Sequence, residues 1–334
     1  MKKIKMLNTN LELSNICLGC GDFGGKLSKD EAFEIMDTYV VSGGNFMDTA
    51  NVYCRWIPGK GNCSEKIIGD WLKSRNAYHK VIVATKGGHY DLENPSIPRV
   101  NKKAITKDLE ESLKTLGTDC IDFYWLHRDD ETKPIEEIIE IMEEFVKSGK
   151  IRYYGASNYT LERMQKAKDY AIKNKYQGFS ALSNQWSLAT VNSQINVKAD
   201  PSLKSMSPAF YQWHKKYNIP IVPYSATASG FFEKLYRANP IIKNGELISS
   251  LDELKMSENI KNNYINKCNI SIYEELLKLK KENEVSLYVL SLAYLLNHPF
   301  QVFPISSVSR KEQLQDFVKA SDIVLDRKII EGIM

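Results

Sequence analysis

Short apolar segments alternate with longer amphipathic segments along nearly the whole chain. The apolar segments have the length of buried strands, and the amphipathic ones repeat with the period of an α-helix. Strands are predicted at eight places: Ile16–Leu18, Asn45–Met47, Val81–Thr85, Ile121–Leu126, Ile151–Gly155, Ala181–Asn184, Ile219–Pro223 and Val302–Ile305. Ahead of them, Ile4 to Ser14 carries Asn8-Thr9-Asn10 between two alternating arms, which predicts a hairpin.

Helix signals lie between most of these strands. Ser28 followed by Glu31 is a capping box, which predicts a helix over Lys29–Ser42. Pro134 suits a first helical turn and predicts a helix over Ile135–Lys150. Three further helices are predicted over Thr106–Leu116, Thr160–Lys173 and Val285–Leu296. The last of these is almost entirely apolar, so we expect it to be buried.

Repeated alternation of strand and helix is typical of a parallel sheet covered by helices. Eight strands in about 250 residues of core favour an α/β fold closed into a (β/α)8 TIM barrel, with an N-terminal hairpin and long loops at the C-terminal face. The alternative is an open doubly wound sheet, because Gly19-Cys20-Gly21-Asp22-Phe23-Gly24 has the spacing of a dinucleotide fingerprint. The next helix signal comes only at Ser28, so this match is weak. We predict a single barrel domain over residues 1–334 with an insertion around residues 239–270.

Composition narrows the class of protein without changing the fold. The 334 residues carry 45 basic and 41 acidic side chains, and a formal charge of +4 is too small to indicate nucleic acid or an anionic membrane. No apolar run approaches the roughly 20 residues that cross a bilayer. No apolar h-region follows the charged start of the chain. We therefore expect a cytoplasmic protein that acts on a small molecule.

The six cysteines are too sparse for a disulfide scaffold in a chain of this length. Cys17 and Cys20 form a CxxC pair, but no second pair follows and the chain has only five histidines. We predict no metal site and expect both residues to be small apolar side chains. The other four are expected to be inert as well: Cys54, Cys63, Cys120 and Cys268.

Titratable side chains gather where three consecutive predicted strands end. Asp48 and Tyr53 follow the second strand, Lys86 ends the third, and His127 follows the fourth. Any one of them alone would most often be structural. In a barrel, however, these strand ends share one face, so the four side chains are expected to meet at one site.

Such a set suits carbonyl chemistry, because each member has a part in moving one proton. Tyrosine has an ordinary pKa of about 10, and the ammonium of Lys86 is expected to lower the pKa of Tyr53. Asp48 would keep Lys86 charged in a buried pocket, while His127 would hold the substrate oxygen or relay its proton. The hydride must come from a cofactor, because no side chain supplies one.

With these residues identified, the chain resembles the aldo-keto reductase family. The resemblance is carried by Asn45-Phe46-Met47-Asp48-Thr49-Ala50 with Tyr53, by Ser64–Gly69, and by Leu113–Asp122 leading to His127. It continues in Gly155–Asn158, Asn184-Gln185, Pro223-Tyr224-Ser225 and Ser307–Leu314, and it spans about Leu7 to Ala320. These motifs are specific, and they imply a barrel oxidoreductase with a nicotinamide cofactor.

The resemblance also implies roles for individual residues. Tyr53 would be the general acid/base, tuned by Lys86 and Asp48, and His127 would orient the carbonyl. The nicotinamide would be bound by Ser157, Asn158 and Gln185 through its carboxamide and by Tyr224 through stacking. The nucleotide would be lined by Gly19, Cys20, Gly21, Asp48, Ser225, Thr227 and Gly230. Its adenosine end and 2′-phosphate would be bound by Ser309, Arg310 and Gln313.

Arg310 decides which cofactor is predicted. Its planar guanidinium keeps its charge and can bind a phosphate through two hydrogen bonds, so we predict NADP(H). Phe317 departs from the family pattern, since many relatives carry an asparagine there that contacts adenine, and weaker adenine binding is expected. The segment Cys54–Cys63 is longer than the usual glycine link, and Trp56 within it is expected to border the substrate pocket.

Three more residues near the strand ends have two interpretations each. Trp125 points either to the core or to the mouth of the barrel. His89 and Tyr90 either reach the substrate or lie on the loop surface.

The leading prediction is an NADP(H)-dependent oxidoreductase that interconverts a carbonyl (aldehyde, ketone or sugar) and its alcohol by hydride transfer. A second is a nucleotide-binding redox sensor or accessory subunit with little turnover, as the potassium-channel beta subunits of the family are. A third, a barrel lyase or isomerase without nicotinamide, is disfavoured by Ser157, Asn158 and Gln185. The substrate, the direction of the reaction and the oligomeric state are left open.

Overall fold

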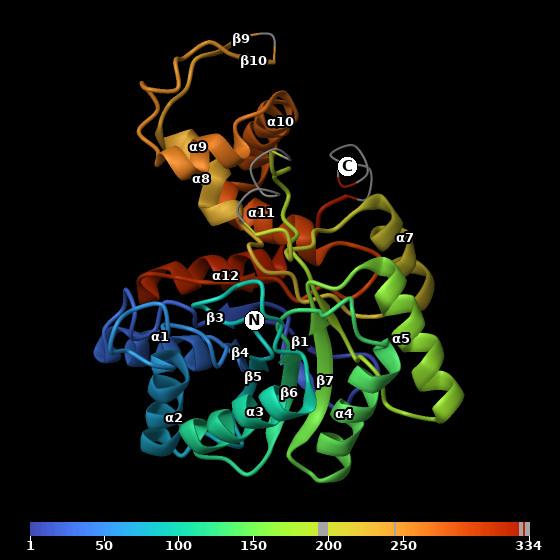
Figure 1. The fold of residues 1–334 in the computed structure, drawn as a ribbon. Helices are drawn as coiled ribbons and strands as arrows, with labels where there is room; N and C mark the ends of the chain where they lie inside the picture. The colour runs from blue at the N-terminus through green and yellow to red at the C-terminus, as the bar shows by residue number, and fades with distance from the viewer. Residues whose placement is uncertain (193–199, 244, 327–329, 331–334) are drawn as a thin grey trace.

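A parallel sheet forms the centre of the molecule (Figure 1), in a computed structural model that describes residues 1–192, 200–243, 245–326 and residue 330. Seven strands follow the order β11-β3-β4-β5-β6-β7-β8. They are β3 (Cys17–Gly19), β4 (Phe46–Asp48), β5 (Ile82–Gly87), β6 (Ile121–Leu126), β7 (Ile151–Ser157), β8 (Leu182–Ser183) and β11 (Ile305–Ser306). Each lies within two residues of a segment that the hydrophobic pattern predicts.

Single bridges close this sheet in place of an eighth regular strand. Ile221 pairs in parallel with Leu182 on one side and with Val302 on the other. The segment 219–223 therefore takes the position predicted for the seventh strand, between β8 and the 302–306 segment. All pairings in the sheet are parallel, so the C-terminal ends of the strands lie at one face. The predicted (β/α)8 barrel is confirmed, and the doubly wound sheet is excluded.

The predicted hairpin covers the opposite end of the barrel. Strands β1 (Lys3–Lys5) and β2 (Glu12–Ser14) pair antiparallel. The backbone N–H of Ser14 donates to the Asn45 side chain, just before β4, and that of Asn10 donates to the Tyr153 hydroxyl near the start of β7. Three apolar side chains of this region, Met6, Leu11 and Leu13, pack with the interior cluster of the barrel. With the N-terminal end closed in this way, the C-terminal face is left for a site.

Helices cover the outer face of the sheet (Figure 1). They are α1 (Lys29–Val41), α2 (Cys63–Arg75), α3 (Lys102–Leu116), α4 (Ile135–Lys147), α5 (Leu161–Asn174), α7 (Pro208–Tyr217), α11 (Leu287–Leu296) and α12 (Leu314–Asp322). The helices α8 (Phe231–Arg237) and α10 (Lys267–Asn283) contact α11 and lie farther from the sheet (Figure 1). The capping box is present, because the Glu31 N–H donates to Ser28 Oγ and the Ser28 N–H donates to the Glu31 carboxylate. Helix α3 begins four residues before its prediction, because Asn101 Oδ1 accepts from the Ala104 N–H and caps it there.

The predicted insertion extends away from the barrel (Figure 1). Apart from residue 244, which lies outside the described residues, it contains the short hairpin β9 (Ile242–Lys243) and β10 (Glu246–Leu247) and the helix α9 (Glu258–Tyr264). The helix α10, which follows it, is absent from the sequence prediction. None of the described helices is long and apolar enough to cross a membrane.

Two cysteines that were expected to be inert are joined by a disulfide. Cys54 and Cys63 have Cα atoms 5.8 Å apart, within the range that a disulfide spans. The sequence prediction was wrong for this pair, because spacing alone does not show that the 54–63 segment turns back on itself. That segment folds through successive turns, in which the Ile57 N–H donates to Cys54 O and the Lys60 N–H donates to Ile57 O. Cys17 and Cys20 are free and buried, as predicted.

Candidate active site

A cavity of about 800 Å³ lies at the C-terminal ends of the barrel strands, a volume typical of a small-molecule site. All four residues predicted to be catalytic line it: Asp48, Tyr53, Lys86 and His127. Most of the residues predicted to bind the cofactor line the same cavity: Gly19, Cys20, Gly21, Asp48, Ser157, Asn158, Tyr224, Ser225, Thr227, Gly230, Ser309, Arg310 and Gln313. The barrel topology therefore brings these distant segments of the chain together.

Gln185 is not brought to this cavity. It lines a neighbouring one of about 770 Å³ together with Trp186. After β8, Gln185 pairs with both Ser205 and Tyr224, and its N–H donates to Lys204 O, so its backbone lies between the two cavities. Phe317 also lies apart from the cavity, because it is fully buried in α12, while Gln313 and Asp316 line it.

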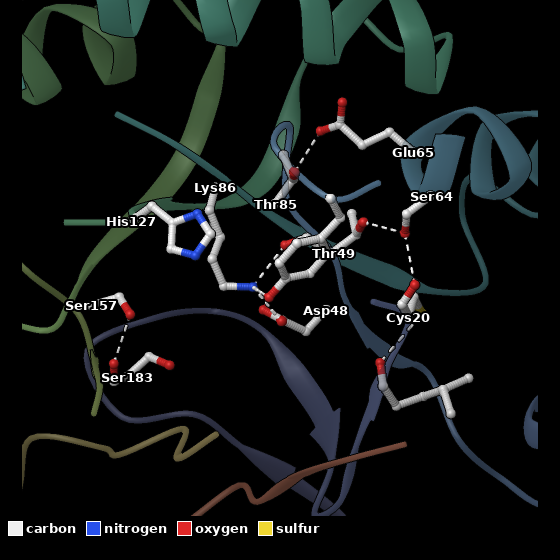
Figure 2. A network of polar contacts seen from close by, with 12 residues as sticks. Cys20, Asp48, Thr49, Ser64, Glu65, Thr85, Lys86, His127, Ser157 and Ser183 are labelled. Atoms are coloured by element: carbon white, nitrogen blue, oxygen red, sulfur yellow. Dashed lines mark hydrogen bonds and ion pairs between the residues drawn. The ribbon is translucent and has the colours of Figure 1, made fainter. Parts of the chain in front are cut away.

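Lys86 is at the centre of the polar contacts in the cavity (Figure 2). Its ammonium donates to Asp48 Oδ2, to Thr49 O at 2.7 Å and to the Tyr53 hydroxyl at 3.2 Å. These contacts use all three of its hydrogens. Lys86 and Asp48 are both buried, so their opposite charges interact with little screening by water. The ammonium is thus fixed beside the phenol.

Burial has the largest effect on the pKa values of Tyr53 and Asp48. It raises the pKa of Tyr53 above its ordinary value of about 10, and the charge of Lys86 opposes this rise without overcoming it. Lys86 lowers the Tyr53 pKa as expected, but burial outweighs it, so the expected net lowering is wrong. Burial also raises the pKa of Asp48, against the charge of Lys86. Burial would lower the pKa of Lys86, but Asp48 and Tyr53 raise it. The result is a neutral phenol hydrogen-bonded to an ammonium.

His127 lines the cavity beside Lys86 and Tyr53 (Figure 2). Its ring centre is 5.9 Å from that of Tyr53, and its backbone N–H donates to Gly87 O on the neighbouring strand. Burial, followed by the charge of Arg128, holds the pKa of His127 well below its ordinary value. Its Nδ1 is buried with no hydrogen-bond partner in the described part of the chain. A neutral imidazole carries one N–H, so it can donate a hydrogen bond to a carbonyl oxygen.

A second layer of contacts holds the strand ends in place (Figure 2). The Thr49 hydroxyl lies 2.7 Å from Ser64 Oγ, which donates to Cys20 O, and the Thr85 hydroxyl donates to Glu65 at 2.5 Å. Ser64 and Glu65 therefore tie the first turn of α2 to strands β3, β4 and β5. Ser64 and Glu65 carry no predicted role of their own, although the sequence shows a Ser-Glu pair where a helix begins.

Asn158 connects the catalytic wall to Tyr224. Its amide donates to His127 O at 3.2 Å, and its Oδ1 accepts from the Tyr224 hydroxyl at 2.7 Å. Beside it, the Ser157 hydroxyl donates to Ser183 O at 2.8 Å (Figure 2). The Tyr224 ring is thereby held at the cavity wall, where a planar ring could stack on it.

Another part of the wall is basic. Arg310 and Lys234 line the cavity, and no ion pair within the described ranges includes either of them. Gln313 fixes the turn that carries Arg310, because its Oε1 accepts from the N–H groups of Ser309 and Arg310. An aromatic ring and a proton donor on one part of the wall, with two unpaired cations on another, fit a nicotinamide dinucleotide with its phosphates.

Comparison with known proteins extends this assignment. The model of the Aldo/keto reductase family matches residues 15–333. An uncharacterized oxidoreductase of Bacillus subtilis, YrpG, is 29% identical over 333 residues, covering 96% of this chain and 91% of its own. The probable aryl-alcohol dehydrogenase AAD4 of Saccharomyces cerevisiae is 25% identical, covering 92% of this chain and 88% of its own. Norsolorinic acid reductase B of Dothistroma septosporum is 26% identical, covering 97% of this chain and 78% of its own.

Proposed function

Because this chain belongs to the aldo/keto reductase family and is a carbonyl/alcohol oxidoreductase, we propose that it uses NADP(H) with Tyr53 as the general acid/base. The nicotinamide, when bound, supplies or accepts the hydride. The observation that carries the proposal is the contact of 3.2 Å between the Tyr53 hydroxyl and the buried Lys86 ammonium. A phenol with a cation beside it can give up its proton and remain stabilised as an anion.

In the reductive direction, the Tyr53 hydroxyl donates its proton to the oxygen of the substrate. Lys86 stabilises the phenolate that is left, and Asp48 keeps Lys86 charged and in place. The neutral imidazole of His127 donates a hydrogen bond to the same substrate oxygen and so orients it. In the oxidative direction, the Tyr53 phenolate accepts the proton of the alcohol.

NADP(H) rather than NAD(H) is proposed on the strength of Arg310 and Lys234. Both line the cavity without an acidic partner in the part of the chain that the structure describes. A 2′-phosphate would supply that partner through charge-assisted hydrogen bonds. Ser309, Gln313 and Asp316 border the same region.

The proposed substrate is a small aldehyde, ketone or sugar. A cytoplasmic location, independence of metals and the absence of nucleic-acid binding stay predictions from the sequence. The names of the relatives add aryl alcohols and their aldehydes to the candidates.

The test is the rate of NADPH oxidation by the purified protein with a panel of aliphatic and aromatic aldehydes, ketones and sugars. We expect turnover with at least one aldehyde. Tight NADPH binding without turnover on any member of the panel would favour the redox sensor or accessory subunit. Absence of both binding and turnover would overturn the proposal.

A further inference from the structure

Arg128 is a buried cation beside the proposed proton donor, and the mechanism above does not use it. It directly follows His127 at the end of β6, lines the same cavity and is only 9% exposed. Its Nη1 donates to His127 O at 2.9 Å, and its Nη2 donates to Asp200 Oδ2 at 3.2 Å. Its Nε has no partner among the residues that the structure describes. A guanidinium has five N–H donors, so most of its donor capacity is unused.

Two other loops hold Arg128 in one place. Asp200, which lies between β8 and α7, accepts from the Ser202 hydroxyl at 2.5 Å through Oδ1 and from the Tyr90 hydroxyl at 3.2 Å through Oδ2. The guanidinium carbon of Arg128 is 5.4 Å from the centre of the Tyr90 ring. The cation is therefore fixed before any substrate enters, which reduces the entropy lost on binding.

The rings of Tyr90, His89 and His127 are in contact one after another, from Arg128 to the proposed position of the reacting carbonyl. The His89 ring lies 4.0 Å from the Tyr90 ring and 4.7 Å from the His127 ring, measured between centres. His89 is 7% exposed and is not among the residues that line the cavity, so it packs behind His127 and does not lie on the loop surface. An apolar substrate group placed against Arg128 would leave its buried N–H donors without partners, which costs binding free energy.

We propose that Arg128 is a specificity-determining residue that selects carbonyl substrates with a hydroxyl or second carbonyl oxygen on the carbon next to the reacting carbonyl. This inference rests on the proposed function. His127 would donate a hydrogen bond to the oxygen of the reacting carbonyl. Arg128 is the next residue in the chain, so it would be placed to donate to an oxygen on the carbon next to that carbonyl. The substrate oxygen that accepts from Arg128 is uncharged, because Asp200 already balances the charge of Arg128.

The test compares two aldehydes of the same size, 2-hydroxypropanal and 2-methylpropanal, which differ by a hydroxyl in place of a methyl group. We expect the unmodified enzyme to favour 2-hydroxypropanal in kcat/KM by about tenfold or more. A site with unpartnered hydrogen-bond donors discriminates against 2-methylpropanal, which has no hydroxyl to accept from them. In Arg128→Met this ratio should fall to near one. The ratio between substrates cancels any general loss of turnover in the variant.

Arg163→Met is the matched control. Arg163 is also a largely buried arginine paired with an aspartate, Asp129, at 2.7 Å, but it does not line the cavity. Its substrate ratio should equal that of the unmodified enzyme. Arg128→Lys, which keeps the charge and loses the planar fork, should restore only part of the preference.

A second variant covers the case in which Arg128→Met does not fold. Asp200→Asn removes the balancing carboxylate, so the guanidinium should then favour a substrate with a full negative charge, such as a 2-oxo acid, relative to 2-hydroxypropanal. An unmodified enzyme that turns over both aldehydes equally would overturn the inference and leave the proposed function standing. No NADPH oxidation with any carbonyl compound would instead overturn the proposed function.

Discussion

At the scale of single residues, the titration of the Tyr53 hydroxyl governs the proposed chemistry. Burial raises its pKa above about 10, so the phenol stays protonated throughout the neutral range. Reduction needs the protonated phenol, and we expect kcat for reduction to be nearly constant from pH 6 to about pH 9. Oxidation needs the phenolate, so its rate should still be rising at about pH 10. A change in kcat with an apparent pKa well below about 9, in either direction of the reaction, would contradict the raised pKa of Tyr53.

Tyr53→Phe keeps the ring and removes the proton nearest to the Lys86 ammonium. We expect kcat to fall by about 10²–10⁴-fold while NADPH affinity is nearly unchanged. The rising limb of the oxidative profile should vanish in this variant. In Lys86→Met, by contrast, it should move to higher pH, because the cation that opposes the rise in the Tyr53 pKa is gone. Near-normal turnover in Tyr53→Phe would show that another group, with His127 as the next candidate, is the acid.

Arg310 carries the prediction of cofactor preference. A charge-assisted hydrogen bond to a 2′-phosphate is worth about 1.5–3 kcal/mol, which corresponds to roughly ten- to hundredfold in affinity. Arg310→Ala should remove most of the preference for NADPH and leave NADH binding nearly unchanged, as measured by fluorescence titration. Lys311→Ala serves as the control, because Lys311 pairs with Glu34 and does not line the cavity. Equal affinity of the unmodified protein for both cofactors would contradict the proposal.

At the scale of structural elements, the disulfide-closed segment between Cys54 and Cys63 follows Tyr53 directly and begins α2. It carries Trp56, whose ring centre is 6.1 Å from that of Tyr53. The segment therefore packs beside the proton donor. Trp56 is 56% exposed and is not among the residues that line the cavity, so its place at the substrate pocket stays a prediction. The cross-link limits how far the segment can move relative to the site.

The cross-link predicts a measurable loss of stability when it is removed. Closing a loop with a sequence separation of 9 residues stabilises a protein by about 2–3 kcal/mol. The double variant Cys54→Ser/Cys63→Ser should lose that much free energy of unfolding in urea titrations, and Cys120→Ser should lose little. Alkylation of the denatured, unreduced protein should modify four of its six cysteines, because 6 − 2 = 4. Modification of all six would show that the cross-link is absent.

At the scale of the whole molecule, buried neutral histidines link stability to pH. Burial lowers the pKa of His89, His214 and His298 to about 4 each. Below the ordinary value of about 6.5 the unfolded chain binds protons that the folded state does not, so stability falls as pH falls from about 6.5 to about 4. Each histidine contributes a slope of about 1.4 kcal/mol per pH unit in that window. Acid should therefore weaken the fold well before most carboxylates titrate.

Urea unfolding at pH 7, 6 and 5 tests this expectation. His298→Gln should reduce the slope of the unfolding free energy against pH by one histidine's contribution, about 1.4 kcal/mol per unit. A free energy of unfolding that does not change between pH 7 and pH 5 would contradict the assignment of buried neutral rings.

The amino-acid sequence was enough to predict the barrel and to choose most of the residues that line its cavity. Strands and helices follow from local periodicity and capping, and the predicted bounds of β6, Ile121–Leu126, match the structure. Asp48, Lys86 and His127 end or follow consecutive parallel strands, so the barrel topology alone brings them together. Tyr53 follows on the same loop as Asp48. These features depend on short stretches of chain, which a sequence shows directly.

Features that depend on how distant segments approach one another become visible only in the folded chain. The Cys54–Cys63 pairing, the turn of Gln185 into the neighbouring cavity and the burial that raises the pKa of Tyr53 are of this kind. The contact of Arg128 with Asp200 joins residues 72 positions apart. Burial and long-range contacts depend on the packing of the whole chain, and no local pattern of hydrophobic and polar residues encodes them.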